Sequence, residues 1–239
     1  MPNAKKVKMK FLALLACVIA VQAAKTGDLS KPYSPQIGGK VAPLLPEEYA
    51  FNFVQHKWNE NGFGVNHVGM GSWLSSSKHR MVRVDNSDYD WVSNNATVKG
   101  PITAGLITSL FDFSHVEKSG NITNHYIEYK GRNNKCTSSE LPMAASQGQL
   151  FPPKYIQENG QYSGQETFAG IGITYTADKW VTFIGTTVVS FYFDGQGNWV
   201  RYDQSSPGLK TTVITLLYNL NKNARFADSV FSTDICATQ

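Results

Sequence analysis

Residues 69–73, Gly-Met-Gly-Ser-Trp, are one residue away from the G-x-S-x-G motif that presents a nucleophilic serine in α/β-hydrolases. That motif needs a strand before the serine and a helix after it. Around Ser72 the pattern is that of a β-strand with no helix behind it, so we reject the motif. A secreted hydrolase would therefore need a nucleophile, a base and a donor that converge from distant segments. We expect no catalytic residue and no enzyme activity.

The histidines offer no metal motif, because none of them has H-x-H or H-E-x-x-H spacing. They are His56, His67, His79, His115 and His125. Residues 85–90, Asp-Asn-Ser-Asp-Tyr-Asp, place oxygen ligands in a row, but they lack the glycine and the distal glutamate of an EF-hand loop. If calcium binds, Asp88 and Asp90 are the expected ligands, because a spacing of two puts both on one face of an extended segment. A solvated turn is the alternative, and calcium is the one cofactor left open.

The first 23 residues predict a secretory signal peptide. Four lysines precede the apolar run Phe11 to Val21, and Val21-Gln22-Ala23 is a small-residue cleavage site. The run of about eleven apolar residues is too short for a bilayer, which needs about twenty. Cleavage would reduce the 22 basic residues to 18, equal to the 18 acidic residues. We therefore expect a secreted or endomembrane-lumen protein with no membrane span after cleavage and no nucleic-acid partner.

The cysteines and sequons fit an oxidising compartment. Cys17 lies in the signal, which leaves Cys136 and Cys236 as an even pair, and we predict a disulfide between them. Two free thiols at a metal or redox site are the alternative, but no C-x-x-C is present and no histidine lies near either cysteine in the sequence. The sequons at Asn95 and Asn121 predict N-glycans, which would require both residues to lie on exposed turns.

Short apolar windows between turn clusters predict one mainly β domain over residues 46–239, preceded by an extended leader at 24–45. Residues 51–58 fit either a strand or a short helix. Residues 140–156 carry three prolines and are expected to form a crossing loop with a helical turn that lies over a sheet face. The expected strands are 66–75, 81–85, 106–113, 124–130, 168–175, 180–184, 188–193, 198–202 and 211–218. Gly170 and Gly172 suggest a bend or bulge inside one of these strands.

Large apolar side chains are concentrated on these β patterns. They would either fill an ordinary sandwich core or leave a lipid-sized cavity on the concave side of a curled sheet. An interior cavity well above about 300 Å³ would favour the second interpretation. The predicted pocket residues are Trp58, Phe63, Trp73, Phe111, Phe113, Trp180, Phe183, Phe191, Phe193 and Leu216.

The order of the β patterns and the paired cysteines resembles that of ependymin-related and LolA-like secreted proteins over most of the mature chain. The residues that carry the resemblance are Phe53-Val54 to Trp58, Gly71-Ser72-Trp73, Arg83-Val84-Asp85, Asn134-Lys135-Cys136-Thr137, Trp180, Val189 to Asp194, Tyr218-Asn219, Phe231 and Cys236. The resemblance implies a strongly curved antiparallel sheet, as an open barrel or two stacked sheets, with a deep apolar pocket for fatty acids or other lipids. It also favours a strand at 51–58. Vertebrate ependymins, which are similar in being secreted and glycosylated, carry more cysteines than this chain, and a homodimer stays open.

Two functions are consistent with these observations. The first is a secreted, non-enzymatic protein that binds a lipid or another hydrophobic small molecule, such as a fatty acid, in a β-lined pocket. The alternative is an extracellular adhesion or matrix-interaction module, in which the same apolar residues form a packed core and a glycosylated, tyrosine-rich surface meets protein or carbohydrate.

Overall fold

Alternating apolar and polar residues form long strands in the computed structural model, which describes residues 40–59, 67–89, 106–116, 120–130, 133–143 and 149–237. All of them belong to one compact unit, residues 36–239. Among the described residues, no helix has both the length and the apolar composition needed to cross a bilayer. The strands are β1 (Glu48–Asn59), β2 (His67–Ser76), β3 (Met81–Tyr89), β4 (Leu106–Asp112), β5 (Asn121–Lys130), β6 (Asn133–Pro142), β7 (Gln161–Ala169), β8 (Thr174–Ile184), β9 (Thr187–Phe193), β10 (Trp199–Ser206) and β11 (Thr211–Asn221). The short helices are α2 (Tyr155–Asn159), η2 (Pro207–Leu209), η3 (Asp228–Phe231) and α3 (Asp234–Ala237).

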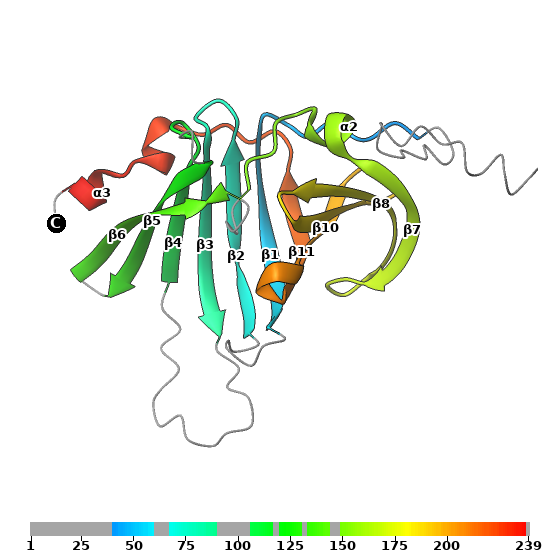
Figure 1. Ribbon diagram of the computed structural model, residues 1–239, viewed down its shortest axis with the longest axis horizontal. Helices are drawn as coiled ribbons and strands as arrows, with labels where there is room; N and C mark the ends of the chain where they lie inside the picture. Colours follow the sequence, from blue (N-terminus) through cyan, green and yellow to red (C-terminus); the bar gives the residue numbers. More distant parts are fainter. Residues whose placement is uncertain are drawn as a thin grey trace, which may run out of the picture. The chain divides into compact units, whose positions relative to one another are not determined.

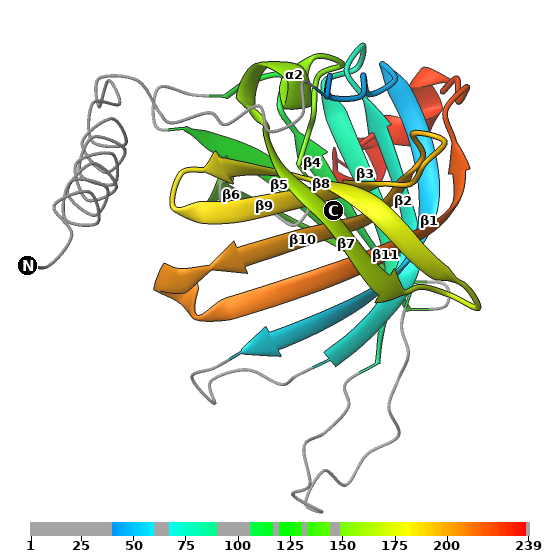
Figure 2. The same cartoon turned by 90° about the vertical axis from the view of Figure 1, so that its right-hand side faces the viewer.

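The strands form a single antiparallel sheet in the order β6-β5-β4-β3-β2-β1-β11-β10-β9-β8-β7, with β6 and β7 at its two edges. Figures 1 and 2 show that the sheet is strongly curved. The strands on either side of β1, namely β2–β6 and β7–β11, form two arms that turn towards each other. The predicted fold class is therefore confirmed, in its form of one open curved sheet.

β1 lies at the middle of the sheet, where the first and the last strand of the domain meet. Its Phe53 is opposite Gly71 of β2 on one side and Leu217 of β11 on the other. Tyr49, Phe51 and Phe53 are all buried on one face, which is the period of two expected for a strand. The ambiguity over residues 51–58 is thus resolved in favour of the strand.

The prediction of one bent strand across residues 168–175 is wrong. β7 ends at Ala169 and β8 begins at Thr174, and the Gly170 N–H donates to the Ile173 carbonyl at 2.7 Å across the turn between them. Gly172 has a φ of 71°, a conformation that glycine adopts without steric cost. The two glycines therefore mark a hairpin turn.

The concave face carries the main apolar core. Buried side chains from both arms of the sheet meet there, among them Trp73 of β2, Phe111 of β4, Phe191 of β9 and Trp199 of β10. Phe151 and Ile156, which come from the segment before β7, belong to the same cluster. The core is thus one sheet face that wraps around a short piece of chain.

The convex face of the β2–β6 arm is covered by the C-terminal segment. Phe231 of η3 packs there with Leu110 and Ile127. The disulfide between Cys136 of β6 and Cys236 of α3 is present, with the two Cα atoms 5.1 Å apart, which confirms the predicted pair. Figure 1 shows α3 lying beside β6. The covalent bond therefore holds the chain's last helix against an edge strand.

On the convex face of the other arm, Arg201 of β10 connects neighbouring strands. Its guanidinium lies 4.6 Å from the centre of the Tyr192 ring and 4.8 Å from that of Phe168. It is also paired with Asp203, Nη2 to Oδ2, at 2.6 Å. Because Phe168 belongs to the edge strand β7, these contacts tie that edge to β9 and β10.

Replacement of both cysteines, Cys136→Ser/Cys236→Ser, should lower the free energy of unfolding by about 4–5 kcal/mol, since the bond closes a loop of 100 residues. Urea denaturation with tryptophan fluorescence measures this difference. Reduced wild-type protein is the control and should show the same loss. A wild-type protein whose urea midpoint does not respond to reduction would contradict the assignment.

Candidate functional site

Aromatic side chains on the concave face form a continuous cluster. The Phe51 ring lies 5.5 Å from Trp73 and 5.4 Å from Trp199, centre to centre, and Trp199 lies 5.7 Å from Tyr202. Phe191 joins them at 5.4 Å from both Trp199 and Tyr202. These residues come from β1, β2, β9 and β10, so curvature of the sheet is what brings them together.

The segment of residues 149–159, which we call the crossing segment, covers this cluster. Its Phe151 ring lies 4.9 Å from Phe191, 5.7 Å from Tyr202 and 6.2 Å from Trp199. Ile156 of α2 is also fully buried. Figure 1 shows that the segment leads into α2 at one end of the curved sheet. Phe151 therefore occupies the centre of the concave face, where a ligand would otherwise lie.

A small number of hydrogen bonds between described residues holds the crossing segment, among them Gln149 Nε2 to the Met143 carbonyl and a bond between the Tyr155 and Thr182 side chains. The Leu45 N–H donates to the Pro153 carbonyl at 3.0 Å, and Gln157 Nε2 donates to the Ala42 carbonyl at 2.9 Å. Two consecutive prolines before α2 deprive the segment of backbone donors, and the helix has only five residues before Gly160 ends it. Apolar packing, above all that of Phe151, is thus the main attachment.

A cavity of about 220 Å³ lies at the margin of the crossing segment. Leu150, Phe151 and Tyr155 form one wall, and Phe183 and Ile184 at the end of β8 form another. The Phe183 side chain is 64% exposed. This cavity is an apolar recess that opens to solvent directly beside the buried aromatic cluster.

Polar groups of the concave face are mostly neutral. Gln55 Nε2 donates to Thr215 Oγ1 at 3.1 Å, and Gln204 Nε2 donates to the Tyr202 hydroxyl at 2.7 Å. Burial raises the pKa of the Tyr202 phenol well above its ordinary value, so the phenol stays protonated. The indole N–H of Trp73 is buried and has no hydrogen-bond acceptor among the described residues. The face therefore suits a ligand whose polar part accepts hydrogen bonds.

Six predicted pocket residues are buried together on the concave side: Trp73, Phe111, Phe113, Trp180, Phe191 and Phe193. Trp58 and Leu216 lie on the opposite, convex side, because they alternate with Phe53 and Leu217 along β1 and β11. Phe183 lines the apolar recess, and Phe63 lies outside the described residues. Phe151, Trp199 and Tyr202 were missed by the sequence analysis, although the expected crossing loop contains Phe151.

The structure describes only some of the predicted glycosylation and calcium-binding residues. Asn121 is the half-buried first residue of β5, and Asp88 lies in β3 opposite Gly69. Asn95 and Asp90 lie outside the described residues, as does the side chain of Asp88. Within the described part of the chain, no group of three or more His, Cys, Asp or Glu side chains could hold a metal ion. Glycosylation and calcium binding stay predictions.

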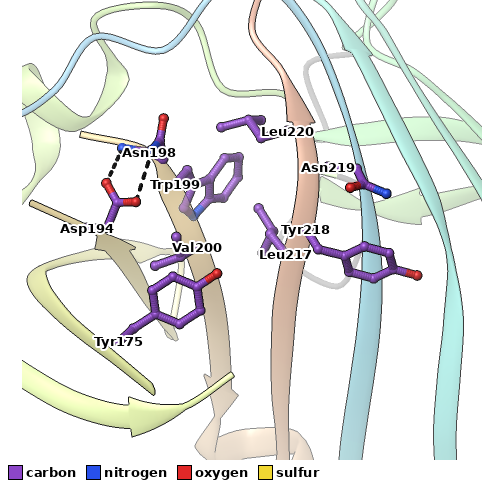
Figure 3. A pocket seen from close by; sticks show the side chains of 9 residues that line it. All are labelled: Tyr175, Asp194, Asn198, Trp199, Val200, Leu217, Tyr218, Asn219 and Leu220. Atoms are coloured by element: carbon purple, nitrogen blue, oxygen red, sulfur yellow. Dashed lines mark hydrogen bonds between the residues drawn. The ribbon is translucent and has the colours of Figure 1, made fainter. Parts of the chain in front are cut away.

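A second cavity, of about 260 Å³, lies between β10 and β11, and we call it the notch (Figure 3). The two strands pair only from Arg201 and Leu216 to Ser206 and Thr211. From Arg201 towards Trp199, β10 is paired only with β9, and from Leu216 towards Asn221, β11 is paired only with β1. The sheet therefore divides between β10 and β11. Bulges mark the division: the β9–β10 register shifts between Trp199 and Arg201, and the β1–β11 register shifts between Ala50 and Asn52.

Ser76, His79 and Asp228 form a serine–histidine–aspartate chain that the sequence analysis did not foresee. His79 Nδ1 lies 2.8 Å from Ser76 Oγ, and His79 Nε2 lies 2.9 Å from Asp228 Oδ1. However, Ser76 is completely buried, and its Oγ donates to Glu48 Oε1 at 2.8 Å. His79 Nδ1 also lies 3.4 Å from Glu48 Oε1, so the imidazole lies between two carboxylates, those of Glu48 and Asp228.

This arrangement is suited to fastening the C-terminal segment, because it joins the β2–β3 turn to the start of β1 and to η3. A serine nucleophile needs an accessible oxygen and a base that accepts its proton. Ser76 is buried, and its hydroxyl already donates to Glu48, so it does not meet these requirements. We call this group the His79 clasp.

The His79 clasp should shift the pKa of the Asp228 carboxyl. The hydrogen bond from His79 holds the pKa of the Asp228 carboxyl below its ordinary value of 3.8. A carboxyl whose pKa is lowered by folding stabilises the folded state above its unfolded pKa, and this contribution disappears as the pH falls through the folded value. The hydrogen bond between His79 and Asp228 should therefore weaken as the pH falls below 3.8 and the Asp228 carboxylate takes up a proton.

Carboxyl-carbon NMR measures this titration directly. The Asp228 midpoint should lie below 3.8 in the wild type and rise towards it in His79→Gln. Asp234 of α3 serves as the internal control, because no contact with His79 reaches it. An Asp228 midpoint that is the same in both proteins would exclude the clasp.

Comparisons with known proteins do not identify the family. No family model matches the chain, and no curated protein matches it. Similar solved structures include a LolA superfamily protein from Nitrosomonas europaea, with 6% identity over 81% of this chain and 93% of that chain and a TM-score of 0.36. An uncharacterized conserved protein from Thermus thermophilus is similar at 9% identity over 76% and 83%, with a TM-score of 0.38. A putative outer membrane lipoprotein-sorting protein domain from Vibrio parahaemolyticus is similar at 9% identity over 79% and 90%, with a TM-score of 0.33. These values are too low to transfer family or function to this chain, and the resemblance to ependymin-related proteins stays a prediction.

Proposed function

We propose that this protein binds a hydrophobic or amphiphilic small molecule, such as a fatty acid or another lipid, between the concave face and the crossing segment, without chemical conversion of the ligand. One observation carries the proposal: the centre of the aromatic face is filled by Phe151 of a short, weakly fastened segment. A second sheet layer would fill such a face permanently, whereas a short segment that packs mainly through Phe151, Tyr155 and Ile156 can be exchanged for a ligand.

The energies of this exchange are comparable. Burial of one phenylalanine side chain contributes about 1.5–3 kcal/mol, and each buried methylene contributes about 0.8 kcal/mol. About two to four methylenes of an alkyl chain would therefore offset the removal of Phe151 alone, and displacement of the buried Ile156 as well requires a longer chain. A longer chain gains more, so a lipid-sized ligand can displace the segment while a small apolar molecule cannot.

The expected path of entry begins at the apolar recess. Phe183 is exposed at its mouth, and Phe151 forms its inner wall, so a chain that enters there meets the anchor first. The unpaired indole N–H of Trp73 supplies a donor within the aromatic cluster. An ester, carbonyl or hydroxyl oxygen of the ligand would satisfy it.

The proposal places this activity outside the cell or in an endomembrane lumen. The predicted signal peptide supports this location, and the Cys136–Cys236 bond is of the kind that persists in oxidising compartments. A secreted carrier of this kind would take up its ligand from an aqueous or membrane source and keep the alkyl chain away from water.

An adhesion module is the second candidate, and the small size of the cavities lined by described residues favours it. The two described cavities have volumes of about 260 and 220 Å³, below the roughly 300 Å³ typical of ligand pockets. In that case the aromatic cluster is a permanent core, and exposed aromatic side chains such as Trp58 and Phe183 meet a partner.

Titration of the full chain with the fluorescent polyene cis-parinaric acid distinguishes the two candidates. The carrier should bind it with a Kd in the micromolar range. Phe183→Ser removes the apolar mouth and should weaken binding about tenfold or more, which corresponds to about 1.4 kcal/mol. Phe151→Leu weakens the anchor and should strengthen binding, provided that thermal unfolding shows a folded protein.

The matched control is Trp58→Ser, which removes an aromatic side chain of 40% exposure from the opposite face. It should leave the affinity unchanged. Absence of binding by the wild type, or equal losses in Phe183→Ser and Trp58→Ser, would reject the carrier and leave the adhesion module.

A further inference from the structure

We propose that the notch between β10 and β11 is a separate binding site for a neutral, hydroxyl-rich ligand, namely a sugar residue of a glycan. This inference is independent of the lipid proposal, because the notch and the crossing segment have no lining residue in common. It rests on the shape of the notch, on its uncharged lining and on one residue in an unusual backbone conformation.

The notch has a floor and two polar sides. Leu217 and Trp199 lie between the strands, whereas Tyr175 and Asn198 stand on the β10 side and Asn219 on the β11 side (Figure 3). An apolar floor with a few polar groups around it is the usual composition of a small-molecule site. A pyranose ring has the matching form, with an apolar C–H face and hydroxyl groups at its edge.

The lining excludes charged ligands. No lysine, arginine or histidine lines the notch, so an anion would find no counter-charge there. The one carboxylate, that of Asp194, is already used: it accepts from the backbone N–H groups of Gln196 and Asn198 and from Asn198 Nδ2, at 2.8–3.0 Å. A carboxylate with three donors in its own turn is a poor site for a cation. The lining of the notch therefore fits a neutral ligand.

Several lining groups keep the capacity to bind hydroxyls. The Tyr175 hydroxyl makes no hydrogen bond with a described residue, and neither do the side-chain carbonyls of Asn198 and Asn219. Asn219 Nδ2 contacts Asn52 Oδ1 only at 3.3 Å. A sugar hydroxyl both donates and accepts, and it can pair with a phenol and with amide carbonyls at the same time.

Asn219 adds a second, independent observation. Its φ is 53°, in the left-handed region that residues other than glycine rarely adopt. It lies opposite the register shift between β1 and β11, and such bulges re-aim side chains next to functional sites. Asparagine adopts this conformation more readily than most residues, so the bulge accommodates an amide at the edge of the notch.

Saturation-transfer NMR on the full chain tests the proposal, with the methyl glycosides of glucose, galactose, mannose and N-acetylglucosamine as probes at roughly 10 mM, suited to millimolar Kd values. At least one glycoside should receive saturation from the wild type. Tyr175→Ala and Asn219→Gly should each weaken its binding tenfold or more. Glycine accepts the left-handed conformation, so Asn219→Gly removes the amide without added backbone strain.

Trp58→Ala is the control, because it removes an exposed aromatic side chain away from the notch, and it should leave glycoside binding unchanged. Both notch variants should keep the wild-type midpoint of thermal unfolding, which shows that they are folded whether or not the protein binds a lipid. The inference is overturned if no glycoside receives saturation, if the notch variants bind as well as the wild type, or if methyl glucuronate, an anion, binds as tightly as the neutral glycosides.

Discussion

The contact of Phe151 with Phe191, Tyr202 and Trp199 is the interaction on which the rest of the structure depends. One curved sheet has a concave face rich in large aromatic rings, and such a face is unstable in water unless it is covered. Here the cover is the segment of residues 149–159, in which Phe151, Tyr155 and Ile156 pack against the face. The stability of the face therefore depends on the packing of this short segment, and in the proposed function the same packing controls access of the ligand.

The two faces of the sheet are covered in different ways. On the convex side, the C-terminal segment is joined to β6 by the Cys136–Cys236 bond and to the β2–β3 turn by the His79 clasp. On the concave side, the crossing segment has no covalent link and few hydrogen bonds. The disulfide-bonded cover fixes the convex face, whereas the non-covalent cover of the concave face is the one that a ligand displaces in the proposed function.

The sequence predicted the elements in which apolar residues alternate strongly, such as β9 and β11, and the disulfide followed from the number of cysteines. It did not predict β6 or most of β7, because edge strands expose both faces and so carry mostly polar residues. It assigned Trp58 and Leu216 to the pocket because both are large and apolar. The face of the sheet on which each side chain lies depends on the register with neighbouring strands. The composition of a single strand does not specify that register.

Other features depended on contacts between distant residues. The His79 clasp joins residues 149 positions apart, and the notch exists because two strands separate at bulges that have no sequence signature. The role of Phe151 depends on the closure of both sheet arms around it, although the prolines beside it did indicate a crossing loop.

Hydrogen exchange of the full chain, with and without saturating cis-parinaric acid, tests the central claim most directly. The Leu45 amide donates to the Pro153 carbonyl and reports on the attachment of the crossing segment, and the amides of Tyr155 and Glu158, which are bonded within the segment, report on its order. If a ligand replaces Phe151, these amides should exchange faster in its presence, while those of β1 and β11 stay protected. Unchanged or slower exchange in the crossing segment of the ligand-bound protein would contradict displacement and show that Phe151 is a permanent part of the core.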